Sequence, residues 1–437
     1  MNHPYKFNPS NLVEPTKEVL PMSLPPTQAP RMANYPDARM DRMVDPGRLL
    51  RSMITSMLRV VGSPRSTIAS VFRTGRQLAN TVGTNRRVDQ ARSTVSTLSG
   101  TGVRGCVDGS GGINGTTQFD GVYGVAVDEF GNVYVADACN HRIRKITPDG
   151  TTTTFAGNGI AGYANGTGGP SGTAQFNYPY GVAIDTDGNL YVADASNHRI
   201  RKISAEGFTT TLAGNGTPGF YDGTGGADDT TQFESPFDVA VDAHGTVYVA
   251  ETYANRIRSV APDGSTTTLA GNGTPGFADG TGGANGTAQF NAPYSVDVSS
   301  DGLVYVADNL NNRIRVISPD GMGGSAVTTL AGNGTKGFTD GTGQASGTTQ
   351  FHRPTGVCVS ATGTIYVADS LNDRIRQISA DGTTTTLAGN RNRGHVDGTL
   401  GPKGTAQFSF PFRVAVDHFG SVYLADSDNN CIRKIET

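Results

Sequence analysis

The chain has 437 residues, 59 of them glycine, and a formal net charge of −3. Glycine stands at nearly twice its usual share of about 7%, and it lies between short runs of Val, Ile, Tyr and Thr. This composition excludes a collagen-like or largely disordered chain and indicates many tight turns between many strands. No stretch approaches the ~20 apolar residues of a membrane span, and no secretory signal is evident.

Residues 1–93 differ in charge from the rest of the chain. They carry 14 Lys and Arg against 6 Asp and Glu, whereas residues 94–437 carry 21 against 32. Residues 1–45 are rich in Pro, Asn and Met, and we expect them to be largely disordered. From Pro46 onward apolar residues recur at helical spacing, with arginines outside that stripe. Residues 46–93 are therefore predicted to form a basic amphipathic helical arm.

Two short motifs recur through residues 94–437. The pair Gln-Phe first occurs at Gln118, and the segment Tyr-Val-Ala-Asp, or a close variant of it, first occurs at Tyr134. Each occurs six times, in steps of 57, 57, 57, 61 and 57 residues. The four extra residues lie around Met322, beside a Pro-Asp-Gly turn, where a longer loop tip costs little free energy. This regular period indicates one large repeat architecture.

Each repeat is predicted to contain four strands. In the first repeat they cover residues 125–127, 133–136, 142–146 and 151–155, with turn residues between them. Four strands in about fifty residues form one propeller blade. The sixth repeat ends after its third strand, and the missing fourth strand stands before the first repeat, at residues 94–100. We therefore predict an all-β, six-bladed propeller over residues 94–437, closed by its own N-terminal strand so that no edge stays open.

The repeats resemble a known family. Asn-His-Arg-Ile-Arg occurs at residues 140–144 and 197–201, each time after a Tyr-Val-Ala-Asp strand, and this resembles the NHL-repeat family. The resemblance covers residues 94–437 and looks most like the teneurin-type and bacterial members, and it implies the β-propeller fold. The family includes RNA-binding and ubiquitin-ligase partners, adhesion receptors, sensor domains and a peptide-amidating lyase, so the resemblance implies no single function.

The charged residues that recur in every repeat are predicted to be structural. Blades pack face to face, so an arginine on a middle strand is buried and needs a carboxylate. Asp137 is placed to pair with Arg142 or Arg144. Glu251 and Cys431 depart from this pattern, and we expect each to weaken the pair of its own repeat.

The glycine-rich loops and the recurring histidines are likewise predicted to be structural. The loops lack the acidic spacing of a calcium-binding EF-hand and the Gly-Lys-Ser/Thr of a phosphate loop. Their Asp or Asn is expected to form Asx-type turns; the six are Asp108, Asn165, Asp222, Asp279, Asp340 and Asp397. His141 and His198 share one repeat position, and we expect them at strand starts. The four cysteines show no paired spacing and are predicted to be free thiols. We predict no catalytic residue, metal or cofactor.

A ligand site is expected where the repeats differ. The position just before the first strand is aromatic in five of the six repeats, and the polar residues around it vary from blade to blade. Aromatic side chains with a few polar groups suit a peptide or a small polar ligand. We predict a site at one mouth of the central channel, formed by Tyr123, Tyr180, Phe237, Asp238, Tyr294, Ser295, Asp297, Phe412 and Arg413. The alternative is that the aromatic side chains only fill the wedges between blades.

These features favour a non-catalytic binding scaffold that presents a propeller face or the channel mouth to a protein, peptide or small polar ligand. One alternative is a metal-dependent propeller enzyme, lactonase- or lyase-like, for which Asp297 is the sole inner carboxylate. The other is an adaptor tethered through residues 46–93 to an anionic membrane or to RNA; the acidic propeller itself argues against nucleic acid. The compartment is not fixed by the sequence: a soluble, cytoplasmic protein is favoured, and the arm leaves organelle targeting open.

Overall fold

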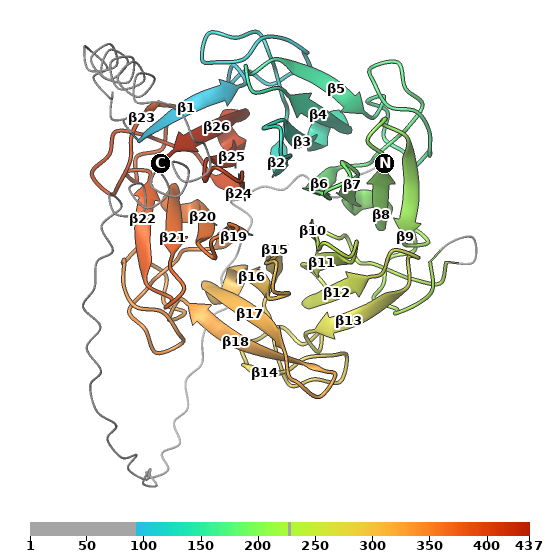
Figure 1. Cartoon of the computed structure of the whole chain (residues 1–437), viewed down its shortest axis with the longest axis vertical. Helices are drawn as coiled ribbons and strands as arrows, with labels where there is room; N and C mark the ends of the chain where they lie inside the picture. The colour runs from blue at the N-terminus through green and yellow to red at the C-terminus, as the bar shows by residue number, and fades with distance from the viewer. Residues whose placement is uncertain (1–92, 226–228) are drawn as a thin grey trace, which may run out of the picture. The chain divides into compact units, whose positions relative to one another are not determined.

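The computed structural model describes residues 93–225 and 229–437. Within them, six antiparallel sheets of four or five strands stand around a common axis (Figure 1). Each sheet is one blade, with its inner strand nearest the axis, so the predicted six-bladed β-propeller is confirmed. The disordered segment predicted over 1–45 lies outside the described residues, as does the arm predicted over 46–93 except for its last residue.

The first three blades each take their four strands from one continuous stretch of chain. Blade 1 contains β2 (Val122–Val127), β3 (Val133–Asp137), β4 (Arg142–Ile146) and β5 (Thr152–Ala156). Blade 2 contains β6 (Pro179–Ile184), β7 (Leu190–Asp194), β8 (Arg199–Ile203) and β9 (Thr209–Ala213). Blade 3 contains β10 (Asp238–Val241), β11 (Val247–Glu251), β12 (Arg256–Val260) and β13 (Thr266–Ala270).

The last three blades follow the same order, with short additions at the rim. Blade 4 contains β15 (Pro293–Val298), β16 (Val304–Asp308), β17 (Arg313–Pro319) and β18 (Ser325–Ala331), edged by β14 (Gly280–Thr281). Blade 5 contains β19 (Pro354–Val359), β20 (Ile365–Asp369), β21 (Arg374–Ile378) and β22 (Thr384–Ala388). Blade 6 contains β24 (Pro411–Val416), β25 (Val422–Asp426), β26 (Cys431–Glu436) and β1 (Thr94–Ser99), edged by β23 (Gly398–Thr399).

Single 3-10 turns join the second and third strands in five blades. They are η2 (Ala138–Asn140), η3 (Ala195–Asn197), η4 (Asn309–Asn311), η5 (Ser370–Asn372) and η6 (Ser427–Asn429). Among the described residues, no helix has the length and apolar character needed to cross a bilayer. The four-residue insertion around Met322 lengthens the hairpin of β17 and β18, whose pairing extends to Pro319 opposite Ser325.

The ring is closed by β1, as predicted. This strand pairs antiparallel with β26, so that Thr94 lies opposite Glu436 and Val95 opposite Ile435. The Val95 side chain is buried in the core of blade 6. Gly100 follows with a φ of 108°, and a Cβ there would lie 2.7 Å from the Asn430 carbonyl oxygen. Only glycine fits this approach, which fixes where the chain leaves blade 6 and enters blade 1.

The Gln-Phe motif supplies the wedge between blades. All six of its phenylalanines have no exposed surface: Phe119, Phe176, Phe233, Phe290, Phe351 and Phe408. Phe119, for example, packs among Val133 and Val135 of blade 1 and Ile432 of blade 6. Burying a phenylalanine side chain contributes roughly 1.5–3 kcal/mol, so this position explains much of the cohesion of the ring.

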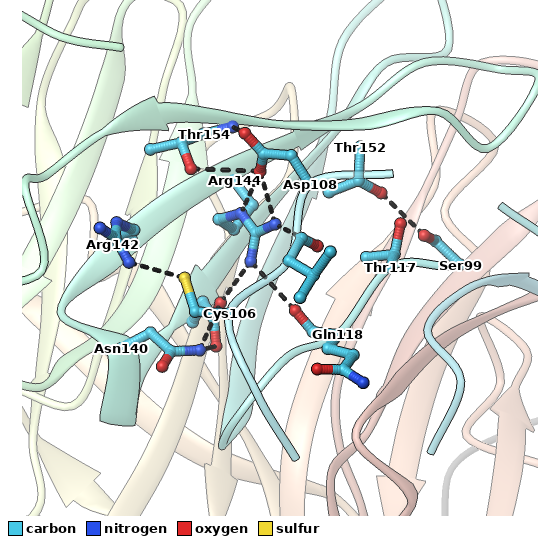
Figure 2. Close-up of polar contacts among 12 residues, drawn as sticks. Ser99, Cys106, Asp108, Thr117, Gln118, Asn140, Arg142, Arg144, Thr152 and Thr154 are labelled. Atoms are coloured by element: carbon cyan, nitrogen blue, oxygen red, sulfur yellow. Dashed lines mark hydrogen bonds and ion pairs between the residues drawn. The ribbon is translucent and has the colours of Figure 1, made fainter. Parts of the chain in front are cut away.

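One fully buried arginine on the third strand of each blade forms ion pairs. The six are Arg144, Arg201, Arg258, Arg315, Arg376 and Arg433. In blade 1, Arg144 donates from Nη1 to Asp137 Oδ2 at 2.7 Å and from Nη2 to Asp108 Oδ1 at 2.6 Å (Figure 2). It also donates to the main-chain oxygens of Gln118 and Val107. Burial raises the pKa of Asp137 to about 6, and the adjacent Arg144 guanidinium opposes that rise.

These contacts settle one open choice and correct three expectations. The partner of Asp137 is Arg144, while Arg142 lies further out and donates to Cys106 Sγ. Glu251 does not weaken its blade, because its longer side chain still reaches Arg258 at 2.8 Å.

Cys431 also leaves the pair of its blade intact. It replaces the outer arginine, while Arg433 and Asp426 stay 2.8 Å apart. The loop residues expected in Asx turns instead serve as second acceptors of the buried arginine, as Asp279 does for Arg315 at 2.6 Å.

We predict that a chain lacking residues 1–93 keeps the cooperative thermal unfolding of the full chain, whereas a chain lacking residues 1–100 does not. The longer deletion removes β1, exposes the edge of β26 and loses the buried Val95, a cost of several kcal/mol on the scale of about 25 cal/mol per Å² of apolar surface. Circular dichroism on heating and light scattering measure the difference. Equal unfolding midpoints and no aggregation in both truncations would contradict the closure by β1.

Candidate functional site

The five aromatic residues predicted at the channel mouth contact one another in a closed ring. Successive ring centroids are 4.7 Å apart for Tyr123 and Tyr180, 4.7 Å for Tyr180 and Phe237, and 5.3 Å for Phe237 and Tyr294. The ring closes from Tyr294 to Phe412 at 6.0 Å and from Phe412 to Tyr123 at 4.9 Å. These spacings are those of favourable aromatic pairs. We call the five residues the aromatic plug, because they fill this end of the channel.

The sixth place in that ring is taken by Thr355. Its side chain is buried and its hydroxyl donates to the main-chain oxygen of Phe412 at 2.7 Å. Tyr294 and Phe412 contact each other past this smaller residue. Four members of the plug are almost fully buried, and Tyr123 is half-buried. The aromatic side chains therefore pack mainly on each other and leave no open mouth at this end.

A polar network lies next to the plug and joins four blades. Arg413 of blade 6 forms a buried ion pair with Asp238 of blade 3, Nε to Oδ2, at 3.1 Å. Its Nη1 donates to Ser295 Oγ at 2.8 Å and to the Val357 carbonyl, and its Nη2 donates to the Val296 carbonyl at 3.1 Å. Burial raises the pKa of Asp238 and the Arg413 guanidinium opposes the rise. A charged pair this deep needs this many partners.

The nine residues predicted as one site thus divide into three groups. Five form the plug, and Asp238, Ser295 and Arg413 form the network beside it. Asp297 lies on the wall of an axial cavity that Arg413 also lines, and its Oδ2 accepts a hydrogen bond from the Val359 N–H at 2.7 Å. Burial raises the pKa of Asp297 to about 6. The sequence indicated that these residues lie near the axis, but it could not show that most of them contact one another.

His141 and His198 form contacts between blades. His141 has a left-handed φ of 54°, and its Nδ1 accepts a hydrogen bond from the Tyr178 N–H of blade 2 at 3.2 Å. His198 Nδ1 accepts in the same way from Ser235 of blade 3 at 3.1 Å. The other blades use Asn or Asp as the acceptor: Asn255, Asn312, Asp373 and Asn430. The histidines are therefore neutral hydrogen-bond acceptors, and burial lowers the pKa of both.

Sequence reasoning missed a set of exposed aromatic side chains stacked on arginines. In each of them, an aromatic residue of the loop that follows the outer strand of one blade contacts the first residue of the third strand of the next blade. The guanidinium carbon lies 4.4 Å from the ring centroid for Arg199 and Tyr163, 4.2 Å for Arg256 and Phe220, 3.6 Å for Arg313 and Phe277, and 4.5 Å for Arg374 and Phe338. Such cation–π pairs contribute about 0.5–1 kcal/mol at exposed sites.

The repeat itself carried a signal for these stacks. In blade 6 the arginine is replaced by Cys431, and the loop aromatic is replaced in the same blade by His395, whose Nε2 lies 3.5 Å from the sulfur. In blade 1 the aromatic is replaced by Cys106, which accepts from Arg142 at 2.6 Å. In blade 6 the two positions change together, which is what contact predicts, whereas blade 1 keeps its arginine. All four cysteines are free, as expected.

The stacks and the plug lie on one face of the propeller. In each blade the inner and third strands begin on this face, and the second and outer strands end on it. In blade 3, for example, Asp238 pairs with Ala250, Ala250 with Ile257, and Ile257 with Ala270. The loop aromatics on this face are exposed by 61%, 54%, 39% and 37% for Tyr163, Phe220, Phe277 and Phe338. We call these four residues and their stacked arginines the aromatic face.

In residues 93–225 and 229–437, no group of three or more His, Cys, Asp or Glu side chains is placed to hold a metal ion. The geometry on this side of the propeller is that of a rigid surface with aromatic and cationic groups. The class of protein that the fold and this surface define is a closed, six-bladed β-propeller with an exposed aromatic face.

Comparisons with known proteins identify the repeat. The family model for the NHL repeat matches residues 119–146, 176–203 and 351–378, and the teneurin NHL domain model matches residues 217–318. The chain therefore belongs to the NHL-repeat β-propeller family.

Two curated relatives are similar to this chain in sequence. The chain is 27% identical to NHL repeat-containing protein 2 of Bos taurus over 346 residues, which is 71% of this chain and 46% of that protein. It is 30% identical to Protein SUPPRESSOR OF QUENCHING 1, chloroplastic, of Arabidopsis thaliana over 257 residues, which is 56% of this chain and 24% of that protein. The chain thus covers less than half the length of either relative.

A solved structure shares the fold at low sequence identity. An auxiliary nutrient binding protein from Bacteroides ovatus superposes with a TM-score of 0.57 at 18% identity, over 79% of this chain and 77% of that one.

We predict that replacing His141 and His198 together by Asn makes the propeller more resistant to acid. Because burial lowers the pKa of both histidines, the unfolded chain takes up these protons first as the pH falls. Their contribution to stability is therefore complete above an unfolded pKa of about 6.5 and declines below it. Asn keeps the acceptor, as it does in blades 3, 4 and 6, and does not titrate.

The measurement is the thermal unfolding midpoint across pH. We expect the double variant to match the wild type at about pH 8 and to unfold at a higher temperature at about pH 5. The matched control is His244→Asn, since His244 is exposed on the opposite face. If the midpoints of the double variant and the wild type change in parallel with pH, the neutral-acceptor assignment is wrong.

Proposed function

We propose that this chain is a non-catalytic binding scaffold that holds a protein or peptide partner on the aromatic face of its propeller. The observation that supports it is the set of four exposed aromatic side chains stacked on arginines on four consecutive blades: Tyr163, Phe220, Phe277 and Phe338. Aromatic residues and arginine are enriched at protein–protein interfaces, and a few such residues carry most of the binding energy.

The stacks are held in place before any partner arrives. Arg256 donates to the main-chain oxygens of Ala254 and Asn272, and Arg313 donates to those of Asn311 and Asn333. Each guanidinium is thereby fixed on the backbone and in turn fixes the ring of its stack. Ordering a long side chain on binding costs about 0.5–1.5 kcal/mol, and here that cost is already met in folding.

The charge of this face indicates the chemistry of the partner. The buried carboxylates bind the inner arginines, such as Arg258 and Arg315. The outer arginines Arg199, Arg256 and Arg313 form no ion pair with a carboxylate of the described residues. Their positive charge stays available to a partner. We infer that the partner presents carboxylates together with apolar side chains.

The plug supports a surface contact rather than a ligand in the channel at this end. The rings of Tyr180 and Phe237 are buried against their neighbours, and Arg413 fills the space next to them. A ligand that approaches from this side meets the loops of the blades, where the stacks are.

We predict that the triple variant Phe220→Ser, Phe277→Ser, Phe338→Ser loses its partner while it stays folded. The rings lie in loops outside the blade cores, with 54%, 39% and 37% of the residue surface exposed, so the blades keep their cores without them. Their removal takes away three anchors, each of which can contribute more than about 1 kcal/mol to binding. The full chain and the variant are used as baits in a lysate of the native organism, and bound proteins are quantified by mass spectrometry.

The control carries Phe130→Ser and Phe419→Ser, which lie on hairpins of the opposite face with 74% and 82% of their surface exposed. We expect this control to capture the same partner as the wild type. Capture of the same proteins by the triple variant at wild-type level would contradict the proposal.

A further inference from the structure

A cavity of about 180 Å³ lies on the propeller axis, lined by the inner strands of the blades. The last residues of these strands, such as Val127 and Val298, line it and are half-buried, so the cavity opens on the face of the hairpins that join inner and second strands. Its other end is closed by Arg413 and the plug. It is therefore a blind pocket that opens on the face opposite the aromatic face.

The side chains that line this pocket are Val, Ala and Ile, apart from Asp297, Cys358 and Arg413. At one position of the inner strands the six blades contribute Ala126, Ala183, Ala240, Asp297, Cys358 and Ala415. Asp297 is the one carboxylate among the described residues that line the pocket. A carboxylate next to alanine, valine and isoleucine side chains is costly unless a positive charge or donors balance it.

The charges around the pocket do not balance within the described residues. Arg413 also lines it, and its guanidinium opposes the rise that burial causes in the pKa of Asp297, but its ion pair is with Asp238 at 3.1 Å. The carboxylate of Asp297 accepts a main-chain hydrogen bond from Val359. Two carboxylates, Asp238 and Asp297, and one guanidinium, Arg413, leave one net negative charge at this part of the axis.

The hairpin turns that follow the lining strands carry further carboxylates. Four of the six inner strands are followed directly by an aspartate of the hairpin turn: Asp128, Asp185, Asp242 and Asp417. Like charges around a concave, low-dielectric opening focus the field and raise the local concentration of oppositely charged ligands.

We propose that this pocket binds a small organic cation, a primary ammonium group on a short alkyl chain, with Asp297 as its counter-ion. An apolar cavity of about 150 Å³ holds benzene, so the volume suits about five or six non-hydrogen atoms. The alkyl chain contacts the Val and Ala walls, and the ammonium group reaches the carboxylate at the level of Cys358. This site is on the other face from the proposed partner and does not depend on it.

The alternatives fit the walls less well. An anion meets Asp297 and the aspartates of the hairpin turns. A metal ion needs several hard ligands, and no group of three or more His, Cys, Asp or Glu among the described residues is placed to supply them. A neutral molecule of the same size leaves the carboxylate without a counter-charge.

The probe is n-butylammonium chloride, titrated into the full chain at about pH 8 and followed by calorimetry. 1-Butanol and butyrate are the neutral and anionic comparators of similar size. We expect saturable binding of butylammonium to one site, and binding of each comparator weaker by at least about tenfold. A ligand of about five non-hydrogen atoms is expected to bind with a Kd near the millimolar range, so the titration extends to about 50 mM.

The decisive variant is Asp297→Asn, which keeps the shape and removes the charge. We expect it to weaken butylammonium binding by at least about tenfold. Asp297→Ala is the second variant, because alanine occupies this position in four other blades and the repeat accommodates it. The matched control is Asp301→Asn, which removes one charge from the hairpin of the same blade outside the pocket and should change Kd less than about twofold.

Ionisation of Asp297 gives an independent readout. Because burial raises its pKa to about 6, butylammonium should bind more weakly at about pH 5 than at pH 8 in the wild type, and Asp297→Asn should lose this dependence. The proposal is overturned if Asp297→Asn binds like the wild type, if 1-butanol binds as well as butylammonium, or if the wild type shows no saturable binding in this range.

Discussion

The buried arginine of each blade is the interaction on which the rest of the propeller depends. A guanidinium that is fully removed from water must find acceptors for its N–H groups, because an unpaired buried charge costs several kcal/mol. In blade 4, Arg315 takes acceptors from three separate segments: Asp308 of the second strand, Asp279 of the preceding loop and the carbonyl of Gln289 before the inner strand. One arginine side chain therefore holds the preceding loop, the Gln-Phe segment and the second strand of its blade together. Repeated six times, it sets the geometry of the whole face.

The two ends of the propeller axis differ in structure. On the aromatic face, loops held by the buried arginines present the outer arginine–aromatic stacks, and the plug fills the centre. On the opposite face the channel stays open as a pocket that contains Asp297. The same symmetric frame thus separates a broad contact surface from a small charged cavity. Function on such a frame resides in the positions where the blades differ, since the shared positions build the ring.

Much of the fold could be predicted from the sequence because it is local and repeated. The period of 57 residues, the four strands of each repeat and the displaced strand at 94–100 are all properties of single segments. The pairing of Asp137 with an arginine followed from the same reasoning, but the choice between Arg142 and Arg144 did not. Arg142 and Arg144 are two residues apart on one strand and so lie on the same face, and Arg142 is directly opposite Asp137 in the register. Only the packing of the neighbouring loop shows that Arg144 is the fully buried partner.

The candidate site was predicted less completely for a related reason. Sequence variation at the inner strands pointed to Asp238, Ser295 and Arg413. It did not show that Arg413 reaches from blade 6 to Asp238 of blade 3 and Ser295 of blade 4. A long side chain can span the narrow axis, and its rotamer is set by partners that are distant in sequence. The exposed stacks were missed because each pairs a loop with a strand of the next blade about 36 residues away, as Phe277 and Arg313 do. Joint replacement at Cys431 and His395 was the available clue.

Hydrogen–deuterium exchange on Arg315→Lys tests most directly whether one arginine holds each loop of the aromatic face. Lysine keeps the charge but is a single donor head that cannot reproduce the two-sided contacts of Arg315 to Asp308 and Asp279. We expect amides of the loop between β13 and β15, such as Gly276 and Gln289, to exchange at least about tenfold faster. The inner strand β15 should keep its protection. Unchanged exchange in this loop, in a variant that stays folded, would contradict the account.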